Sequence, residues 1–219
     1  MPSHTIAIIG GTGPEGLGLA LRFAKAGEAI IIGSRSAERA QEAVATIRAK
    51  LPHAQVRGMT NAEAAAQASM ILVTVPFEGQ KDTLTPLAAQ TAGKIVINAV
   101  VPLQFVKGKG MKALLVEEGS AAQQAQALLP QAKVIAAFQN LSAKELAEID
   151  HELPSDVVVC GDDKEAKATV IALAGKIQGV RGVDGGGLDN ARYVEDLTAL
   201  LLNINRIYKT QSTIKLVGL

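Results

Sequence analysis

The chain has 219 residues, of which 48% are hydrophobic and 20% are charged, and its formal net charge is +1. This composition is ordinary for a globular protein with a real core, and it gives no argument for a nucleic-acid partner or an acidic membrane surface. One cysteine excludes an intrachain disulfide, no apolar run is long enough to span a bilayer, and an early first strand leaves no room for a signal peptide, so we expect a cytoplasmic protein.

The chain opens on a predicted strand over 5–9, a glycine loop and a helix over 17–26. Within the loop, Gly11, Gly13 and Gly16 have the G-x-G-x-x-G spacing of a dinucleotide-binding turn. In such turns the first glycine permits the tight turn, the second lets backbone approach a pyrophosphate, and the third lets the helix pack on the strand. The helix N-terminus would then attract the phosphates. The alternative interpretation is a purely structural turn.

A second strand over 29–32 ends in residues that predict which dinucleotide binds. An NAD site usually carries Asp or Glu there, whereas this chain has Ser34 and Arg35, with Arg39 one helical turn further on. A carboxylate would repel a 2′-phosphate, but a guanidinium can bind it through a bidentate fork. The sequence therefore predicts NADP(H) rather than NAD(H). The alternative, a solvated helix start, would place cations unfavourably near a helix N-terminus.

Strands and helices go on alternating as far as residue 98, and Asn61 has a side chain suited to cap the second helix of this region. This alternation predicts an α/β fold, a Rossmann-like, doubly wound, mostly parallel sheet with right-handed crossovers. The predicted elements are helices over 36–51, 62–67 and 83–90 and strands over 56–59, 70–75 and 94–98.

Ligands of such sheets bind outside the carboxyl ends of the strands. The ring of Phe77 could wall a cofactor pocket or cover the core, and Val75 and Val101 could be plain packing residues. The residues that this rule nominates as ligand contacts are Thr12, Gly13, Pro14, Glu15, residues 34–36, Val75, Pro76, Phe77 and residues 98–102, which include Val101 and Pro102.

The pattern loosens between residues 100 and 119. The basic run Lys107–Gly110 fits a substrate loop or a solvated turn equally well. A helix over 120–129 and a strand over 134–138 follow, and the strand delivers the polar pair Gln139 and Asn140 to the ligand edge of the sheet. We leave open whether that pair touches a ligand. Ser142 and Glu145 then have the spacing of a capping box.

The remaining chain predicts a small C-terminal segment that ends in a long helix. Cys160 fits a buried small hydrophobe better than a nucleophile, and the glycines 185–187 form a hinge or close-approach turn. Asp189 is expected to cap the final helix, whose apolar stripe packs on the core or on a second subunit. The predicted elements are strands over 157–160 and 181–184 and helices over 164–177 and 189–208.

The sequence shows none of the residue patterns that are typical of metal sites, nucleophilic triads or carbonyl-reducing tyrosines. The three histidines have no metal-site spacing, and neither a Ser/His/Asp set nor a Tyr-x-x-x-Lys motif occurs. Hydride transfer to a second redox cofactor needs only two stacked rings held at close range. We therefore assign no catalytic side chain and no metal ligand.

Several motifs together resemble those of the NADPH-dependent reductases of coenzyme F420, an 8-hydroxy-5-deazaflavin. The resemblance runs nearly end to end, and two of its motifs are also similar to the cytosolic domain of STEAP-type ferric reductases. The residues that carry it are Gly10–Gly13, Gly33–Arg35 with Arg39, Val75–Phe77, Val101–Pro102, Glu118–Ala122, Cys160–Asp163, Leu188–Arg192 and Glu195–Thr198.

The resemblance implies a hydride transfer between nicotinamide C4 and deazaflavin C5 in a homodimer. It places the deazaflavin between the sheet edge and residues 151–219, which would form a small second domain and the dimer interface beside an NADP-binding domain over 1–150. Its expected NADP contacts are Thr12, Gly13, Pro14 and Glu15, with Ser34, Arg35 and Arg39 on the 2′-phosphate and Phe77, Val101 and Ala143 flanking the nicotinamide half.

Two residues depart from that family pattern. Gln139 stands where some members carry His, which leaves any proton-handling role there in doubt, although an amide can still hydrogen-bond the deazaflavin. Glu15 replaces a neutral residue, and its carboxylate must point away from the pyrophosphate or be compensated. We expect an F420:NADP oxidoreductase; the alternatives are an NADPH-dependent flavin or ferric reductase and a non-catalytic NADP-sensing protein.

Overall fold

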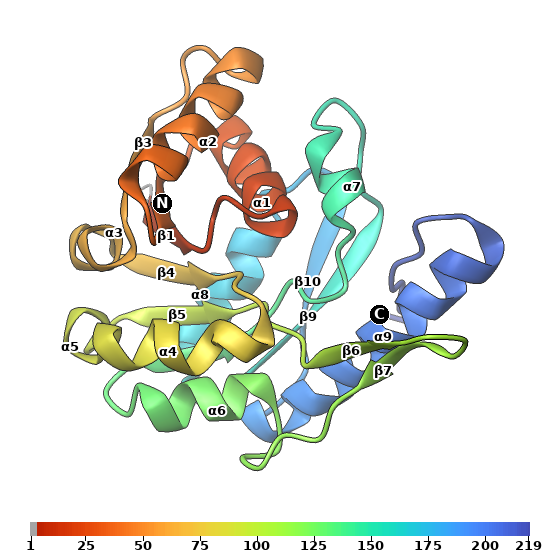
Figure 1. Ribbon diagram of the computed structural model, residues 1–219. Coiled ribbons are helices and arrows are strands. Elements are labelled where there is room, and N and C mark those ends of the chain that lie inside the picture. The colour runs from red at the N-terminus through yellow and green to blue at the C-terminus, as the bar shows by residue number, and fades with distance from the viewer. Residues whose placement is uncertain (1–3) are drawn as a thin grey trace.

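An eight-stranded sheet with helices on both faces forms the body of the computed structural model, which describes residues 4–219 (Figure 1). The strand order is β10-β9-β8-β5-β4-β1-β2-β3, and a separate two-stranded hairpin is formed by β6 and β7. The strands are β1 (Thr5–Ile9), β2 (Ala29–Ser34), β3 (Val56–Thr60), β4 (Met70–Val73), β5 (Ile95–Asn98), β6 (Leu103–Val106), β7 (Gly110–Ala113), β8 (Lys133–Ala136), β9 (Ser155–Gly161) and β10 (Val180–Asp184).

The expected Rossmann-like, mostly parallel sheet is confirmed. Strands β1 to β5 and β8 are joined by parallel ladders, and β10 runs parallel to β9. Within the eight-stranded sheet, only the β8–β9 pair is antiparallel. The chain winds outward from β1 to β3 and then returns to β4, so a crevice opens at the carboxyl ends of β1 and β4. Because β9 and β10 continue the same sheet, a domain division at residue 150 stays a prediction.

The helices cover the two faces of the sheet and bury two cores. Along β1, Ile6 and Ile8 lie in one core with α1, α2, α7 and α8, whereas Ala7 and Ile9 lie in the other with α3 to α6 and α9. The helices are α1 (Pro14–Lys25), α2 (Ala37–Lys50), α3 (Asn61–Gln67), α4 (Gln80–Leu84), α5 (Ala88–Thr91), α6 (Ala121–Leu128), α7 (Ala143–Ala147), α8 (Lys164–Ala174) and α9 (Ala191–Tyr208).

Three local predictions were wrong. The helix expected over 83–90 is split into α4 and α5 by a 3-10 turn (Thr85–Leu87), because Pro86 cannot donate a backbone hydrogen bond within a continuous helix. Thr60, not Asn61, caps α3, in a capping box with Glu63. Asp189 does not cap α9 either, since residues 188–190 form a 3-10 turn before that helix begins.

Two segments that lack regular predicted structure pack against α9. The β6–β7 hairpin replaces the loose region around Lys107, and Asn203 on α9 fixes it by accepting from Met111 N (2.9 Å) and donating to Met111 O (2.7 Å). After α9 ends, residues 209–219 turn back toward β9 and β10: Asp156 N donates to Ile214 O, and Arg181 Nη1 donates to Leu219 O. The chain therefore does not end in its long helix.

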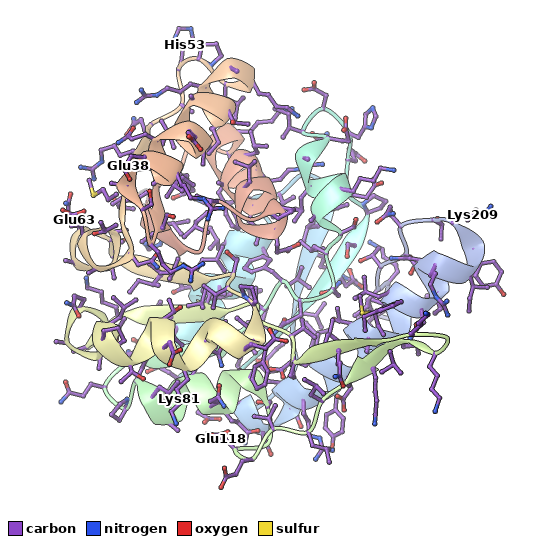
Figure 2. All side chains as sticks on the ribbon, viewed as in Figure 1. Glu38, His53, Glu63, Lys81, Glu118 and Lys209 are labelled. Carbon is purple, nitrogen blue, oxygen red and sulfur yellow. The ribbon has the colours of Figure 1, made fainter. Side chains whose placement is uncertain are left out.

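Most charged side chains lie on the outside of the molecule, whereas Arg22, Glu28, Asp156 and Glu195 are buried. Glu38, Glu63 and Lys81 all project away from the ribbon in Figure 2, as expected for a sheet whose apolar faces are covered by helices. Among residues 4–219, no helix combines the length and the apolar character needed to cross a membrane.

Candidate functional site

The glycine loop joins β1 to α1 in a tight turn. Gly10 is left-handed (φ +76°), and a Cβ added to Gly11 would lie 2.8 Å from Ile8 O, so the tight turn depends on both glycines. Gly13 is the N-cap of α1, and a Cβ added to it would meet nothing closer than 3.6 Å. A Cβ on Gly16 would lie 2.6 Å from Thr74 Oγ1, so Gly16 permits the close packing that its spacing predicts.

A cavity of about 530 Å³ lies in front of this loop, and we call it the glycine-loop cavity. Its volume is within the usual range for small-molecule sites, about 300–1,000 Å³. The N-terminal amides of α1 face it, which gives it one electropositive wall. The nominated residues that line it are Thr12, Gly13, Pro14, Glu15, Ser34, Arg35, Arg39, Val75, Pro76 and Val101.

A second electropositive group lies at the end of β2. Arg35 and Arg39 are both exposed, and neither guanidinium makes a hydrogen bond or ion pair to another side chain of residues 4–219. Ser34 is buried, and its hydroxyl accepts from Ser36 N at 3.3 Å. Two free guanidinium groups and a hydroxyl at one end of a cavity are suited to bind a phosphate.

Asn61 is a lining residue whose role the sequence did not predict. Its Oδ1 atom is buried without a hydrogen-bond partner in the described part of the chain, and it borders the glycine-loop cavity. A buried amide oxygen without a partner is expensive in a folded protein, so it is a natural acceptor for a ligand hydroxyl or amine. Its position at the carboxyl end of β3 was the one available signal. Thr74 and Thr83 line the same cavity.

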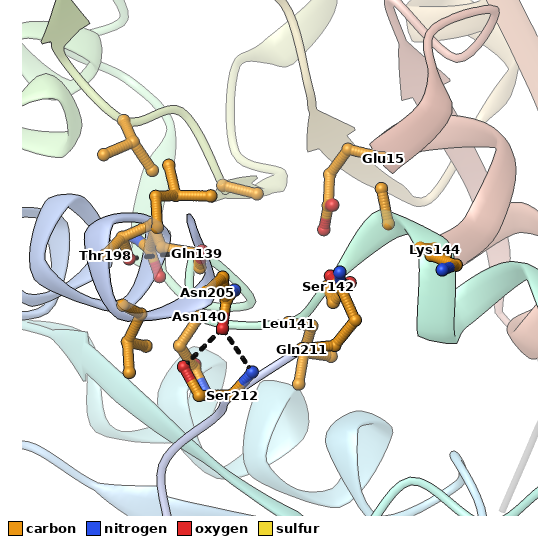
Figure 3. A pocket seen from close by; sticks show the side chains of 15 residues that line it. Glu15, Gln139, Asn140, Leu141, Ser142, Lys144, Thr198, Asn205, Gln211 and Ser212 are labelled. Atoms are coloured by element: carbon orange, nitrogen blue, oxygen red, sulfur yellow. Dashed lines mark hydrogen bonds between the residues drawn. The ribbon is translucent and has the colours of Figure 1, made fainter. Parts of the chain in front are cut away.

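A second cavity, of about 340 Å³, lies between α7, α9 and the C-terminal tail, and we call it the α9 cavity (Figure 3). The predicted residues Val101, Gln139, Asn140 and Ala143 line it. Ala99, from the nominated range 98–102, lines it too. The residues that sequence reasoning missed come from segments distant in the sequence, namely Leu141, Ser142, Lys144, Thr198, Leu201, Leu202, Asn205, Gln211 and Ser212.

Gln139 and Asn140 follow a residue with a strained backbone, and hydrogen bonds donated by their side-chain amides fix their positions. The preceding Phe138 has φ +76°, uncommon for a residue with a side chain. Gln139 Nε2 donates to Asn98 O at 3.1 Å, and Asn140 Nδ2 donates to Asp156 O at 2.9 Å. The Oε1 of Gln139 and the Oδ1 of Asn140 are buried without a partner. The α9 cavity therefore contains two fixed amides with spare acceptors.

The C-terminal tail closes the far side of the α9 cavity. Ser212 donates from its hydroxyl to Asn205 Oδ1 at 2.7 Å, and Ser142 donates to Gln211 Oε1 at 2.6 Å. Both pairs are visible in Figure 3 around the opening of the cavity. The tail thus joins α9 to the start of α7, and the cavity depends on its position.

The two cavities meet at Glu15, Ala99 and Val101, which line both of them. Figure 3 shows the Glu15 carboxyl directed into the α9 cavity from the start of α1. Its Oε1 atom is buried without a partner, and burial raises the pKa of this carboxyl from 4.5 to about 8. The carboxyl at the junction therefore holds a proton more readily than an exposed glutamate does.

Five nominated residues lie outside both cavity linings: Gly11, Ser36, Phe77, Asn98 and Pro102. Phe77 packs against the core that contains α3 to α6, which is the second of the two roles expected for that ring, covering the core. Burial raises the pKa of Cys160 to about 11, which makes this thiol a poor nucleophile. Residues 4–219 contain no group of His, Cys, Asp or Glu side chains placed to hold a metal ion.

Comparisons with known proteins agree with this geometry. Residues 5–102 match a family described as NADP oxidoreductase, coenzyme F420-dependent. An F420-dependent NADP reductase of Methanothermobacter thermautotrophicus is 43% identical over 205 residues, which cover 91% of this chain and 88% of that protein. The metalloreductase STEAP3 of Rattus norvegicus is 30% identical over 88% of this chain, but over only 36% of its own length.

A solved structure is similar over the whole molecule. The crystal structure of a candidate F420-dependent NADP reductase from Arthrobacter sp. FB24 has a TM-score of 0.85 and 25% sequence identity, with coverage of 98% of this chain and all of that one.

Proposed function

Because this chain belongs to the family of coenzyme F420-dependent NADP oxidoreductases, we propose that it transfers a hydride between NADP(H) and the deazaflavin coenzyme F420. The observation that carries this proposal is the meeting of two cavities at Glu15, Ala99 and Val101. One cavity is lined by a dinucleotide-binding loop, and the other is narrow and bordered by spare amide acceptors. Two ligands bound in them would have their inner ends in contact.

The glycine-loop cavity fits NADP(H). The open side of Gly13 and the amides of the first α1 turn provide a cradle for the pyrophosphate. Arg35 and Arg39 are free to bind the 2′-phosphate, with Ser34 as an additional hydroxyl. Asn61 offers its unpaired oxygen to the adenosine half. These assignments reproduce the contacts that the sequence predicts and add Asn61 to them.

The α9 cavity fits the ring system of F420. Val101, Leu201 and Leu202 give it apolar walls, which a flat heteroaromatic ring can contact on its faces. Gln139 presents a buried, unpaired acceptor, and a deazaflavin has ring N–H groups that could donate to it. Gln139 therefore holds the ring by hydrogen bonding, where some relatives carry His.

The residues act chiefly by binding and orienting the two cofactors. When both are bound, nicotinamide C4 and deazaflavin C5 supply the redox chemistry. The side chains at the junction, Ala99 and Val101, are small and allow the two rings to approach each other. Holding the two rings side by side would lower much of the barrier by orientation.

Absorbance of the deazaflavin, recorded with NADPH and F420 over a range of pH, tests this function. We expect NADPH-dependent loss of the oxidised F420 band. Free flavin and ferric chelates, tried as alternative acceptors, test the rival function of an NADPH-dependent flavin or ferric reductase. That function requires one of them to be turned over faster than F420. Tight NADP(H) binding without turnover of any acceptor would instead support a sensing protein.

We also propose a homodimer built on α9. One face of that helix is exposed and apolar. On this face, Tyr193, Leu200 and Ile207 are 64%, 54% and 65% exposed. They recur every seven residues with the half-exposed Leu197 and Ile204 between them, which is the pattern of a helix that packs against another helix. A second copy of the chain would cover this stripe.

The finer organisation of the chain completes the proposal. The NADP-binding part comprises residues 1–150, and residues 151–219 complete the F420 cleft and the dimer contact. The single cysteine is buried and inert, which fits a reducing cytoplasm.

A further inference from the structure

The carboxyl group of Glu15 has no structural role in the contacts of the described chain. Its Oε1 atom is buried, and residues 4–219 offer it no hydrogen-bond partner. An ionised carboxylate in this position would face the phosphates bound at the α1 N-terminus and would lack any compensating cation. Leaving such a group unpaired is unfavourable, so its retention calls for a function.

Its position suggests what that function is. Glu15 is one of only three residues in the described chain that line both cavities, and the other two, Ala99 and Val101, carry no titratable group. The carboxyl therefore lies where the nicotinamide and deazaflavin ends would meet. Gln139, across the α9 cavity, cannot transfer a proton because an amide does not titrate.

Resting on the proposed function, we propose that Glu15 is a catalytic acid–base residue of the hydride transfer. NADPH and oxidised F420 require one proton: the C4–H bond of NADPH breaks with its electron pair, a C–H bond forms at deazaflavin C5, and the Glu15 carboxyl gives its proton to a ring nitrogen. The products are NADP⁺ and F420H₂, and the carboxylate regains a proton from solvent. In the reverse direction, the carboxylate accepts that proton.

The surroundings of Glu15 support this assignment. Burial alone raises the pKa of its carboxyl to about 8, near the value at which a group can serve as acid and base at neutral pH. Neither α9 nor the tail places a charged side chain in the lining. The charged side chains that line either cavity are Lys144 on α7 and Arg35 and Arg39 after β2, and all three are exposed.

A ligand-free measurement tests whether Glu15 holds a proton. The pKa is higher in the folded protein than in the unfolded chain, so the stabilisation is fully present below pH 4.5 and is lost as the pH rises to about 8. We therefore expect the urea midpoint of the wild type, relative to that of Glu15→Gln, to decrease as the pH rises from 4.5 to about 8. Glu42→Gln, which removes an exposed carboxyl on α2, should follow the wild type.

Kinetics with F420 and NADPH test the catalytic role. Glu15→Gln should lower kcat by about 100-fold or more with little change in the KM for NADPH, and should abolish the decline of wild-type F420 reduction at or above pH 8. In the reverse direction, Glu15→Ala should regain activity when formate is added, because formate can accept the proton in place of the missing carboxylate. Glu42→Gln should retain the wild-type profile.

The outcomes distinguish the two proposals. A wild type that turns over F420, together with a Glu15→Gln variant of equal kcat and equal pH profile, would overturn the role of Glu15 alone. A wild type that does not turn over F420 would overturn the proposed function and this role with it. A urea midpoint of Glu15→Gln that follows the wild type at every pH would also contradict a proton on Glu15.

Discussion

At the scale of single residues, Arg35 and Arg39 determine the dinucleotide that we expect to bind. Both are exposed at the mouth of the glycine-loop cavity, and neither is paired with a side chain of residues 4–219. A free guanidinium can make two charge-assisted hydrogen bonds to a 2′-phosphate. Its hydrogen bond to a neutral ribose hydroxyl would be weaker. We therefore propose that cofactor choice depends on these two side chains.

Replacing Arg35 by Ala should raise the dissociation constant for NADPH by about 10- to 100-fold, the worth of one charge-assisted hydrogen-bonded contact. Binding of NADH should change little, because NADH has no 2′-phosphate. Fluorescence titration of the reduced nicotinamide measures both constants. Arg57→Ala, an exposed arginine on β3 outside both cavities, is the matched control. Equal losses for NADPH and NADH would contradict the assignment of Arg35.

At the scale of elements, the C-terminal tail is held by one buried carboxylate. Asp156 on β9 is 0% exposed and accepts from Arg181 Nε (3.0 Å), Arg181 Nη2 (2.7 Å) and Leu216 N (2.6 Å). The hydrogen bond from Arg181 is the main cause that lowers the pKa of Asp156 to about 2. Since the same tail carries Gln211 and Ser212, this carboxylate stabilises the wall of the α9 cavity.

Asp156→Asn should release residues 212–217 and lower the free energy of unfolding by about 3 kcal/mol, because it leaves the Arg181 side without its charge partner. Hydrogen exchange should become fast in the tail. The pKa is lowered in the folded protein, so this stabilisation is present above the ordinary value of 3.8 and is lost as the pH falls toward 2.

Asp150→Asn provides the comparison for that variant. Asp150 pairs with Lys25 at 3.0 Å, but its side chain is 90% exposed, and such surface pairs contribute at most about 1 kcal/mol. The tail should exchange as slowly in this variant as in the wild type. Slow exchange of residues 212–217 in Asp156→Asn as well would rule out the anchoring role of Asp156.

At the scale of the whole molecule, local patterns predicted the sheet and half of the site. The sequence alone reveals the apolar runs at β1 and β4 and the spacing of Gly13 and Gly16, because each of these patterns involves only neighbouring residues. The α9 cavity was only partly foreseen. Gln139 follows a strand end, but Gln211 and Ser212 reach the cavity through contacts across some seventy residues, such as that of Ser142 with Gln211, which no local pattern encodes.

Glu15 illustrates the same limit at the site itself. The sequence indicated that a carboxylate beside the pyrophosphate needs compensation, but it gave no burial and no neighbours. The fold supplies both: α1 directs Glu15 to the junction of two cavities, where burial raises the pKa of its carboxyl. The position of Asn61 was likewise misread as a helix cap, because Asn is common at caps and local sequence does not distinguish it from Thr60.

The exposed stripe on α9 predicts an assembly of two chains. Leu200→Asp should place a charge in the centre of the stripe and shift the protein from dimer to monomer, measured by sedimentation velocity at micromolar concentration. Ala45→Asp, at an exposed apolar position on α2, should leave the assembly unchanged. A wild type that sediments as a monomer would contradict the dimer.

The central claim is direct hydride transfer between the two cofactors bound in the two cavities. The measurement that tests it most directly uses NADPH stereospecifically deuterated at nicotinamide C4, with oxidised F420 as acceptor, and mass spectrometry of the reduced product. We expect one of the two C4 label positions to deliver its deuterium to C5 of F420, even in ordinary water. Reduced F420 that carries only solvent hydrogen from both labelled forms, or no reduced F420 at all, would contradict the account.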